Sequence, residues 1–167
     1  MTKDVKEGKK FQIIKHGEGK HLNMLGDILS IMLSKNETNG TYSILESKVY
    51  PGGGPSPRLQ TREFEGFYII EGELDFIIDG KQVTTKAGTV INIPPRVIHS
   101  FKNNTDTIVK ILVIIAPSGL EKMFEEVGTK ISDINITKPF KPSIEEKKRL
   151  LESSKKYGVD VNRIRHK

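Results

Sequence analysis

Hydrophobic and polar residues alternate in short runs through the middle of the chain, and Gly, Asn or Asp separate the runs. A period of two is typical of strands with one buried face. The runs recur about every 8–12 residues, which favours an antiparallel sandwich or barrel over a βαβ fold. All eight prolines lie outside the runs, in agreement with strands. We predict strands at 25–34, 41–50, 65–71, 74–79, 81–86, 89–93, 97–102 and 107–115, with a further candidate at 11–14.

Two dipeptides between predicted strands indicate tight turns. They are Asn39-Gly40 and Asp79-Gly80. Residues of both types tolerate positive φ, which the two-residue turns of β-hairpins require. We therefore predict that each dipeptide joins its flanking strands as a hairpin.

The last quarter of the chain shows helical spacing instead of alternation. Apolar residues within 118–127 recur at intervals of three and four, so we predict a helix with one face packed on the barrel and Gly128 at its end. The residues of that face are Leu120, Met123, Phe124 and Val127.

A second helix is predicted after an irregular strap at 131–142. Ser143 and Glu146 have the spacing of a capping box, in which each side chain accepts from the backbone amide of the other. The helix should run to about Tyr157, and Gly158 can end it.

Composition excludes several classes of protein. The 167 residues fit one domain with appendages. With no cysteine there is no disulfide, no thiolate metal site and no cysteine nucleophile. The longest apolar run, 111–116, is too short to span a bilayer. Because the first ten residues also lack the apolar core of a signal peptide, a cytoplasmic protein without a membrane segment is the default expectation.

The net charge of +6 resides in the two ends of the chain. Basic residues exceed acidic ones in 1–20 and in 138–167, whereas the central part is mildly acidic. Solubility is a sufficient explanation of such ends. The chain has no zinc-finger, helix-turn-helix or RNP pattern, so we do not expect nucleic acid as a partner.

The segment 88–103 contains a regular series of Gly, Pro, His and Asn. The matching residues are Gly88, Pro94, His99 and Asn103. Their spacing resembles the second motif of the cupin superfamily, in which a Gly commonly stands where this chain has Arg96. The upstream segment 51–72 resembles the first motif: Glu65 and Gly72 match, but Arg58 and Gln60 stand where the family has the two His of an H-x-H pair.

The resemblance is to single-domain bacterial cupins of the quercetin-dioxygenase type, and it covers about residues 20–130. It implies an all-β fold, an antiparallel cupin (jelly-roll) β-barrel with a short C-terminal helical extension, and a homodimer. We accordingly divide the chain into a basic N-terminal segment at 1–19, the barrel with its following helix at 20–130, and a strap, helix and basic tail at 131–167.

The two replaced histidines change the chemistry that the resemblance implies. Family members usually hold Fe, Mn, Ni or Zn with three His and one Glu. Residues i and i+2 of a strand share a face, so Arg58 and Gln60 should point into the barrel beside Glu65 and His99. Arg has no lone pair to give a metal, and a Gln carbonyl is a weak ligand. We therefore expect no metal cofactor; the alternative is a weakly bound Fe, Mn, Ni or Zn ion held by Gln60, Glu65 and His99.

Two interpretations of the polar residues remain open. In the first, Arg58 and Glu65 form a buried ion pair that replaces the metal and its ligand, and Gln60 and His99 complete a hydrogen-bonded network. In the second, Arg58 holds a carboxylate or phosphate, and His99 with Glu65 acts as acid and base. Phe101 follows His99 by two and should face the same interior.

The leading prediction is a protein that binds a small anionic or oxygen-rich molecule at Arg58, Gln60, Glu65, His99 and Phe101, with catalysis left open and His99 and Glu65 as the candidate catalytic residues. One alternative is a metal-dependent dioxygenase-like or isomerase-like enzyme with a remodelled site. Another is a non-enzymatic protein that binds a partner through its basic C-terminal helix.

The remaining residues receive simpler interpretations. Arg62 and Arg96 are expected at the barrel mouth, Tyr50 and Tyr68 are expected to be packed, and His16, His21 and His166 are expected on the surface.

Overall fold

The computed structural model describes residues 11–161, which form twelve strands and three helices. One sheet has seven antiparallel strands in the order β11-β1-β2-β3-β10-β5-β8, and a second has three in the order β7-β6-β9. β12 and β4 pair separately. The strands are β1 (Lys20–Met24), β2 (Asp27–Leu33), β3 (Ser43–Val49), β4 (Leu59–Gln60), β5 (Phe64–Glu71), β6 (Glu73–Ile78), β7 (Lys81–Lys86), β8 (Val90–Ile93), β9 (His99–Lys102), β10 (Val109–Ala116), β11 (Thr129–Lys130) and β12 (Val159–Asp160).

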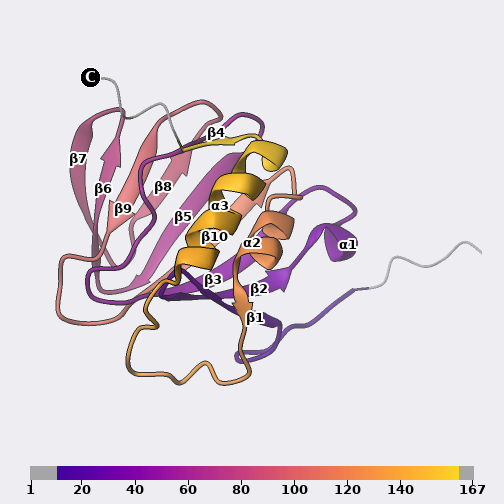
Figure 1. Cartoon of the computed structure of the whole chain (residues 1–167), viewed down its shortest axis with the longest axis horizontal. Helices are drawn as coiled ribbons and strands as arrows, with labels where there is room; N and C mark the ends of the chain where they lie inside the picture. Colours follow the sequence, from indigo (N-terminus) through magenta and orange to yellow (C-terminus); the bar gives the residue numbers. More distant parts are fainter. Residues whose placement is uncertain (1–10, 162–167) are drawn as a thin grey trace, which may run out of the picture.

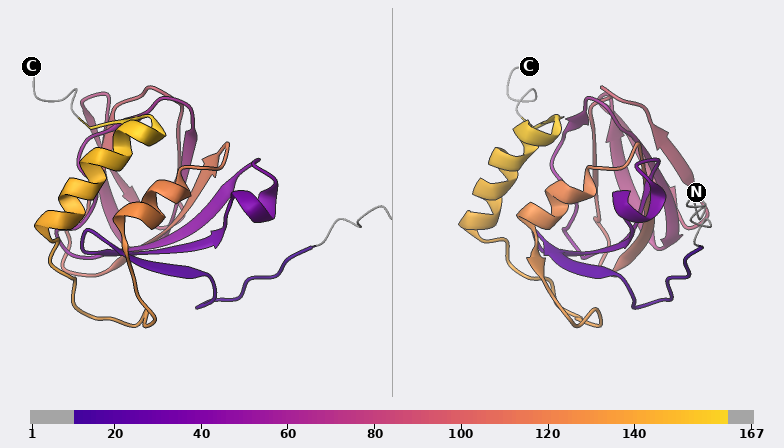
Figure 2. Two further views of the ribbon diagram at one scale, coloured as in Figure 1. Left: turned by 45° about the vertical axis from the view of Figure 1, so that its right-hand side comes forward. Right: turned by 90° about the vertical axis from the view of Figure 1, so that its right-hand side faces the viewer.

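The two larger sheets curve around a shared interior, with two helices on one outer side (Figures 1 and 2). Side chains from both sheets meet there: Phe67 of β5 contacts Phe76 of β6 edge-on at 5.3 Å between ring centroids, and Phe101 of β9 at 5.7 Å. All three rings are buried. The all-β antiparallel barrel with a short C-terminal helical extension is therefore confirmed.

Glycine allows the chain to cross from one sheet to the other between β5 and β6. Gly72 has φ +89°, and a Cβ there would lie 2.8 Å from Cγ2 of Val109. By contrast, β6 and β7 stay in one sheet and are joined by Asp79-Gly80, both with positive φ, with Ile78 opposite Lys81. That predicted hairpin is confirmed.

The other predicted hairpin is wrong. A short helix, α1 (Lys35–Thr38), lies between β2 and β3, capped by reciprocal bonds between Ser34 and Glu37. Asn39 does adopt positive φ, at +51°, but it ends this helix instead of forming a two-residue turn. The prediction that Asn39 adopts positive φ is confirmed. The capping box that precedes it makes this residue the end of a helix instead of part of a hairpin turn.

The start of the described chain also differs from prediction. Residues 11–14 form no strand, and Phe11 and Ile13 are 85% and 72% exposed. The strand that precedes β2 is instead β1. The pattern of alternating apolar and polar residues did not predict it, because the polar Asn23 occupies a buried position in this strand. There Asn23 accepts from the Gly26 amide in the turn and donates to Glu146.

Both predicted C-terminal helices are confirmed as α2 (Glu121–Val127) and α3 (Ile144–Tyr157). α2 buries Met123 and Val127 and is capped by Gly128. α3 begins with the predicted Ser143–Glu146 capping box and ends at Gly158, which has φ +72°. Among residues 11–161, no helix has the length and apolarity needed to cross a membrane.

Candidate functional site

Four polar side chains meet inside the barrel. Arg58 lies just before β4, Gln60 on β4, Glu65 on β5 and His99 at the start of β9. His99 is 0% exposed, and Gln60 and Glu65 are each 3% exposed. The structure thus brings together the four residues that the two sequence motifs singled out.

Backbone hydrogen bonds hold the two motif segments against each other. Arg58 and His99 exchange both of their backbone hydrogen bonds, each at 2.9 Å, and the Arg96 amide donates to the Gln60 carbonyl at 2.7 Å. Upstream, Gly54 lies so close to β9 that a Cβ would stand 2.2 Å from the Phe101 carbonyl oxygen. The two segments are therefore in direct backbone contact, and the side chains of the four cluster residues meet in the interior of the barrel.

Asp27 fixes the loop that leads into the site. Its two carboxylate oxygens accept from the amides of Tyr50 and Gly54, each at 2.9 Å. Burial raises the pKa of Asp27 to about 6, against the lowering effect of these two hydrogen bonds. The loop at 51–57 is thus tied to β2 through an acid that titrates in a mildly acidic range.

Glu65 is the centre of the cluster. Its Oε2 accepts from Gln60 Nε2 at 2.7 Å and lies 2.9 Å from His99 Nε2. Arg58 Nη2 lies 3.3 Å from Oε2 and 3.4 Å from Oε1. Burial by itself would raise the pKa of Glu65, but the Arg58 guanidinium and the contacts with His99 and Gln60 together hold it below its ordinary value.

Both ring nitrogens of His99 face acceptors. Nε2 meets Glu65, and Nδ1 lies 2.9 Å from the Val97 carbonyl oxygen. A ring protonated at both nitrogens donates to both acceptors, whereas a neutral ring donates to only one of them. Both ring nitrogens are thus engaged, and the ring is fixed between the Glu65 carboxylate and the Val97 carbonyl.

Phe101 forms an apolar wall of the cluster. Its ring centroid lies 5.9 Å from the guanidinium carbon of Arg58, and it packs on Phe76 at 5.2 Å. An aromatic face attracts a cation, and apolar surroundings strengthen nearby electrostatic contacts. Phe101 therefore lies against the cluster, on the side predicted from its spacing to His99.

Sequence reasoning missed Glu63. It is 4% exposed, Oε1 lies 3.6 Å from Arg62 Nε, and Oε2 is buried without a hydrogen-bond partner among residues 11–161. Burial raises the pKa of this carboxyl, and the charge of Glu65 adds to that effect. The signal was available, because Glu63 and Glu65 have the i, i+2 spacing of residues on one face of an extended chain.

The two arginines expected at the barrel mouth lie outside the cluster. Arg62 donates from Nη2 to the Tyr157 carbonyl at 2.7 Å, at the end of α3. Arg96 is exposed and has φ +69°, a conformation that favours glycine. The positive φ of Arg96 is compatible with the Gly that the resemblance leads one to expect at this position.

Four further expectations have mixed outcomes. Tyr50 is buried, and its hydroxyl donates to the Ile136 carbonyl at 2.6 Å. Tyr68 is 42% exposed, so its predicted packing is wrong: it lies on the outer face of β5, opposite to Phe67. His16 is exposed as predicted, but His21 is half-buried against Ser30. His166 lies outside the described residues.

A groove of about 320 Å³ lies apart from the cluster, between the segment before β1, α1 and α2. Gly19, Met32, Ser34, Glu37, Lys122 and Glu125 are among its lining residues. None of the four cluster residues lines it. Among residues 11–161, no group of three or more His, Cys, Asp or Glu side chains is placed to hold a metal ion.

Comparisons with known proteins agree with this arrangement. The family model described as "Cupin domain" matches residues 45–115. Quercetin 2,3-dioxygenase of Bacillus subtilis is 24% identical over 117 residues, which are 70% of this chain and 34% of that protein. The chain thus spans about a third of the length of this curated relative.

Solved structures share the fold. One, described as a predicted oxalate decarboxylase from Thermotoga maritima, has a TM-score of 0.58 and 27% identity, covering 64% of this chain and 99% of that one. KdgF from Halomonas sp. has a TM-score of 0.59 and 13% identity, covering 68% and 98%. Residues 45–115 therefore match a cupin domain, and the chain shares its fold with these two solved structures.

Proposed function

We propose that this protein binds a small anionic molecule, of carboxylate or phosphate chemistry, through Arg58 inside the barrel, at a site without a resident metal ion. One observation carries the proposal. Arg58 Nη2 contacts Glu65, whereas Nη1 is buried and has no hydrogen-bond partner among residues 11–161.

The buried Nη1 of Arg58 can donate hydrogen bonds and needs an acceptor to offset its loss of water. A buried donor without a partner costs about 1–3 kcal/mol, and more when it is charged. Arg can bind carboxylate or phosphate through several of its N–H groups at once, in short charge-assisted bonds. An anion that reached Nη1 would satisfy this donor while Nη2 keeps its contact with Glu65.

The donor set does not fit a resident transition metal. The Glu65 oxygens, which would ligate it, already meet N–H donors of Arg58 and Gln60, and the guanidinium brings a positive charge to the same place. Only Glu65 and His99 are good ligands, and transition-metal sites in proteins use three or four. This chemistry supports binding without a metal.

The relatives suggest probes rather than a substrate. One solved relative is described as a predicted oxalate decarboxylase. Oxalate is a small dicarboxylate, and inorganic phosphate represents the other anion class. Both are small enough to test the site without assuming the identity of its natural ligand.

Isothermal titration calorimetry of the protein with oxalate and with inorganic phosphate tests the proposal. We expect at least one of them to bind, and Arg58→Lys to weaken its binding by about tenfold or more, because an ammonium lacks the planar fork. The matched control is Arg96→Gln, which removes an exposed arginine outside the cluster. The proposal fails if neither probe binds, or if the two variants weaken binding equally.

Elemental analysis of protein purified without added metal tests the second half of the proposal. We expect less than stoichiometric amounts of Fe, Mn, Ni and Zn. A near-stoichiometric metal that His99→Ala removes would contradict the metal-free site.

Proton transfer is the second candidate function, because His99 Nε2 and Glu65 Oε2 are 2.9 Å apart. Such a pair can take a proton from a ligand and return one. Malonate, a dicarboxylate with exchangeable methylene protons, provides an assay by proton NMR in D2O. Exchange faster than in buffer, lost in His99→Gln, would support catalysis; equal rates with and without protein would exclude it for this ligand.

A further inference from the structure

We propose that residues 143–161, which comprise α3 and β12 and are called the C-terminal lid here, close the ligand site and must move away from β4 for a ligand to enter. This inference rests on the proposed function, because a lid matters only if a molecule enters the barrel. It goes beyond the proposed function because it names the segment that moves and the place where a ligand enters.

The cluster is closed in this structure. His99 is 0% exposed, Gln60 and Glu65 are 3% exposed, and the Arg58 side chain is 13% exposed. Nη1 of Arg58, the atom that carries the binding proposal, is buried. A ligand coming from solvent therefore needs one wall of the site to move.

β12 is the wall next to β4. Val159 stands opposite Gln60, and Asp160 opposite Leu59. The Thr61 amide and hydroxyl both donate to the Gly158 carbonyl, at 3.0 and 2.9 Å. β4 and β12 form a sheet of their own, so this pairing places β12 directly beside the strand that carries Gln60.

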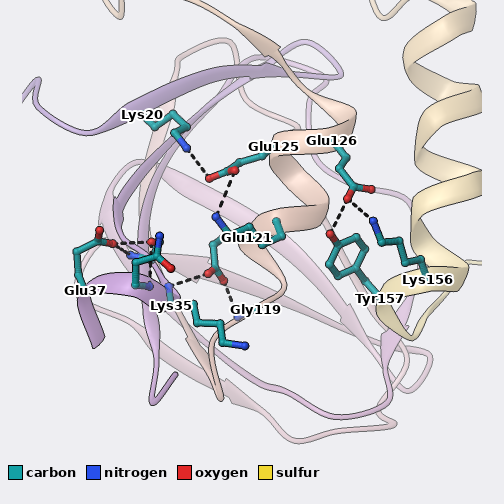
Figure 3. Close-up of polar contacts among 12 residues, drawn as sticks. Lys20, Lys35, Glu37, Gly119, Glu121, Glu125, Glu126, Lys156 and Tyr157 are labelled. Atoms are coloured by element: carbon teal, nitrogen blue, oxygen red, sulfur yellow. Dashed lines mark hydrogen bonds and ion pairs between the residues drawn. The ribbon is translucent and has the colours of Figure 1, made fainter. Parts of the chain in front are cut away.

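Polar contacts near the surface attach the lid to α2. Glu126 of α2 accepts from Tyr157 Oη at 2.6 Å, from Ser153 Oγ at 3.1 Å and from Lys156 Nζ at 2.5 Å. Figure 3 shows Glu126 meeting Lys156 and Tyr157 across the gap between the two helices. Arg149 of α3 also donates from Nε and Nη2 to the Val127 carbonyl, at 3.2 and 3.0 Å. Exposed contacts such as those of Glu126 contribute little each, so local opening of the lid should cost less than global unfolding.

Apolar contacts also hold the lid. Val159 is 5% exposed and belongs to the hydrophobic core, and Tyr157 packs against that core in part. Ile144 and Leu151, in contrast, are 88% and 49% exposed. Leu150 in the middle of α3 and Val161 after β12 also pack against the core in part, so apolar contacts hold the lid along α3 as well as at its far end.

The other end of the lid is suited to be the hinge. Residues 131–143, between β11 and α3, contain no helix or strand. Glu146, in the first turn of α3, accepts from Asn23 and from Thr129, each at 3.3 Å, and so holds this end near β1 and β11. The start of the lid is therefore held near β1 and β11, and its far end must separate from β4 for the site to open.

Loosening the α2 contact should open the lid. Glu126→Ala removes the acceptor of Ser153, Lys156 and Tyr157. Glu125→Ala is the matched control, because Glu125 pairs outside the lid with Lys20 (Figure 3) and with Lys122. Two readouts serve: modification of His99 by diethyl pyrocarbonate, followed by mass spectrometry, and hydrogen exchange of the Thr61 amide. We expect both rates to rise roughly threefold or more in Glu126→Ala only.

Exchange of amides in the central strand β10 serves as the internal reference and should not change, since a rise there would indicate global loosening instead of lid opening. The lid is refuted if the two variants behave alike.

A disulfide offers a second test that does not depend on weakening the fold. The chain has no cysteine, so Leu59→Cys with Asp160→Cys can pair only with each other, and these residues stand opposite in the β4–β12 ladder. We expect the oxidised variant to slow His99 modification and to slow association of oxalate or inorganic phosphate by about tenfold or more. Reduction of the same sample should restore both rates.

The outcomes separate the two proposals. If neither anion binds the wild-type protein, the proposed function fails, while His99 modification still reports on the lid. If an anion binds and associates equally fast with the oxidised and reduced variant, the lid is wrong and the binding site stands.

Discussion

The Arg58 guanidinium lies 3.3 Å from the Glu65 carboxylate, within the interior of the barrel. The resemblance of segment 51–72 to the first cupin motif leads one to expect a metal-ligating histidine at the position of Arg58 and the ligating glutamate at the position of Glu65. A fixed positive charge on the chain therefore stands beside the carboxylate that a metal would otherwise neutralise. The following predictions test what this replacement does to stability, titration and metal binding.

Removing one partner of this buried pair should cost more than removing both. Glu65→Ala leaves Arg58 charged and enclosed, and we expect a loss of about 3–5 kcal/mol in the free energy of unfolding. Arg58→Met combined with Glu65→Ala should lose less than the sum of the two single variants Arg58→Met and Glu65→Ala. Urea denaturation of the four proteins in a double-mutant cycle measures the coupling. Additive single effects would show that the pair does not interact.

Glu65 should also make stability sensitive to acid. Its pKa is lowered in the folded protein from the ordinary value of 4.5, because Arg58, His99 and Gln60 outweigh the effect of burial. Its contribution to stability is thus fully present above about pH 4.5 and is lost as the pH falls through the folded pKa. The difference in unfolding free energy between wild type and Glu65→Gln, measured from pH 7 to pH 3, should shrink toward the acidic end. A difference that grows with acid would contradict this sign.

Asp27 should show the opposite pH dependence. Burial raises its pKa from 3.8 to about 6, so between these values the folded protein holds a proton that the unfolded chain has released. The contribution of Asp27 to stability is therefore present below pH 3.8 and falls as the pH rises through about 6, by on the order of 3 kcal/mol. Carbon-13 NMR of the Asp27 carboxyl should give a midpoint near 6, whereas a midpoint near 4 would contradict the effect of burial.

Restoring the family's histidines should create a metal site. Arg58→His with Gln60→His removes the guanidinium and adds two imidazoles beside Glu65 and His99, giving four good ligands. We expect the double variant to bind Ni²⁺ or Mn²⁺ at least about tenfold more tightly than wild type in calorimetry. Adding His99→Ala should remove most of the gain. No uptake by the double variant would mean that positions 58 and 60 do not face the ligating side of the barrel.

Arg96 should destabilise the turn that it occupies. A non-glycine residue with φ +69° costs about 1 kcal/mol or more through its Cβ. Arg96→Gly should therefore stabilise the protein by about 1 kcal/mol relative to Arg96→Ala, which keeps the Cβ but lacks the charged side chain. Thermal or urea denaturation of both variants provides the comparison. Equal stabilities would show that the turn is not strained.

Features set by local sequence could be predicted well. The Asp79-Gly80 hairpin, the burial of Met123 and Val127 and the capping of α3 by Ser143 and Glu146 all depend on neighbouring residues, and the structure contains each of them. Errors arose where two local signals competed. At Asn39 a turn dipeptide followed a capping box, and at Asn23 a polar residue interrupted a strand pattern because its partner lies on α3.

The candidate site falls between these cases. Strand alternation and motif spacing were enough to group Arg58, Gln60, Glu65 and His99. Which of these residues form hydrogen bonds with Glu65 depends on interatomic distances, and the spacing of residues in the sequence does not give these distances. The homodimer and the cytoplasmic location stay predictions.

The sequence by itself determined that the chain forms a β-barrel and that a capped helix follows it, whereas the replacement of two motif histidines by Arg58 and Gln60 stays a prediction from the resemblance. These properties follow from periodicity and from the chemistry of single residues. Only the tertiary structure decided that β12 lies beside β4, that Glu63 is buried, and that Glu126 joins α2 to the end of α3. Such contacts join positions far apart in the chain or depend on which atoms exclude water, and no pattern of neighbouring residues specifies either.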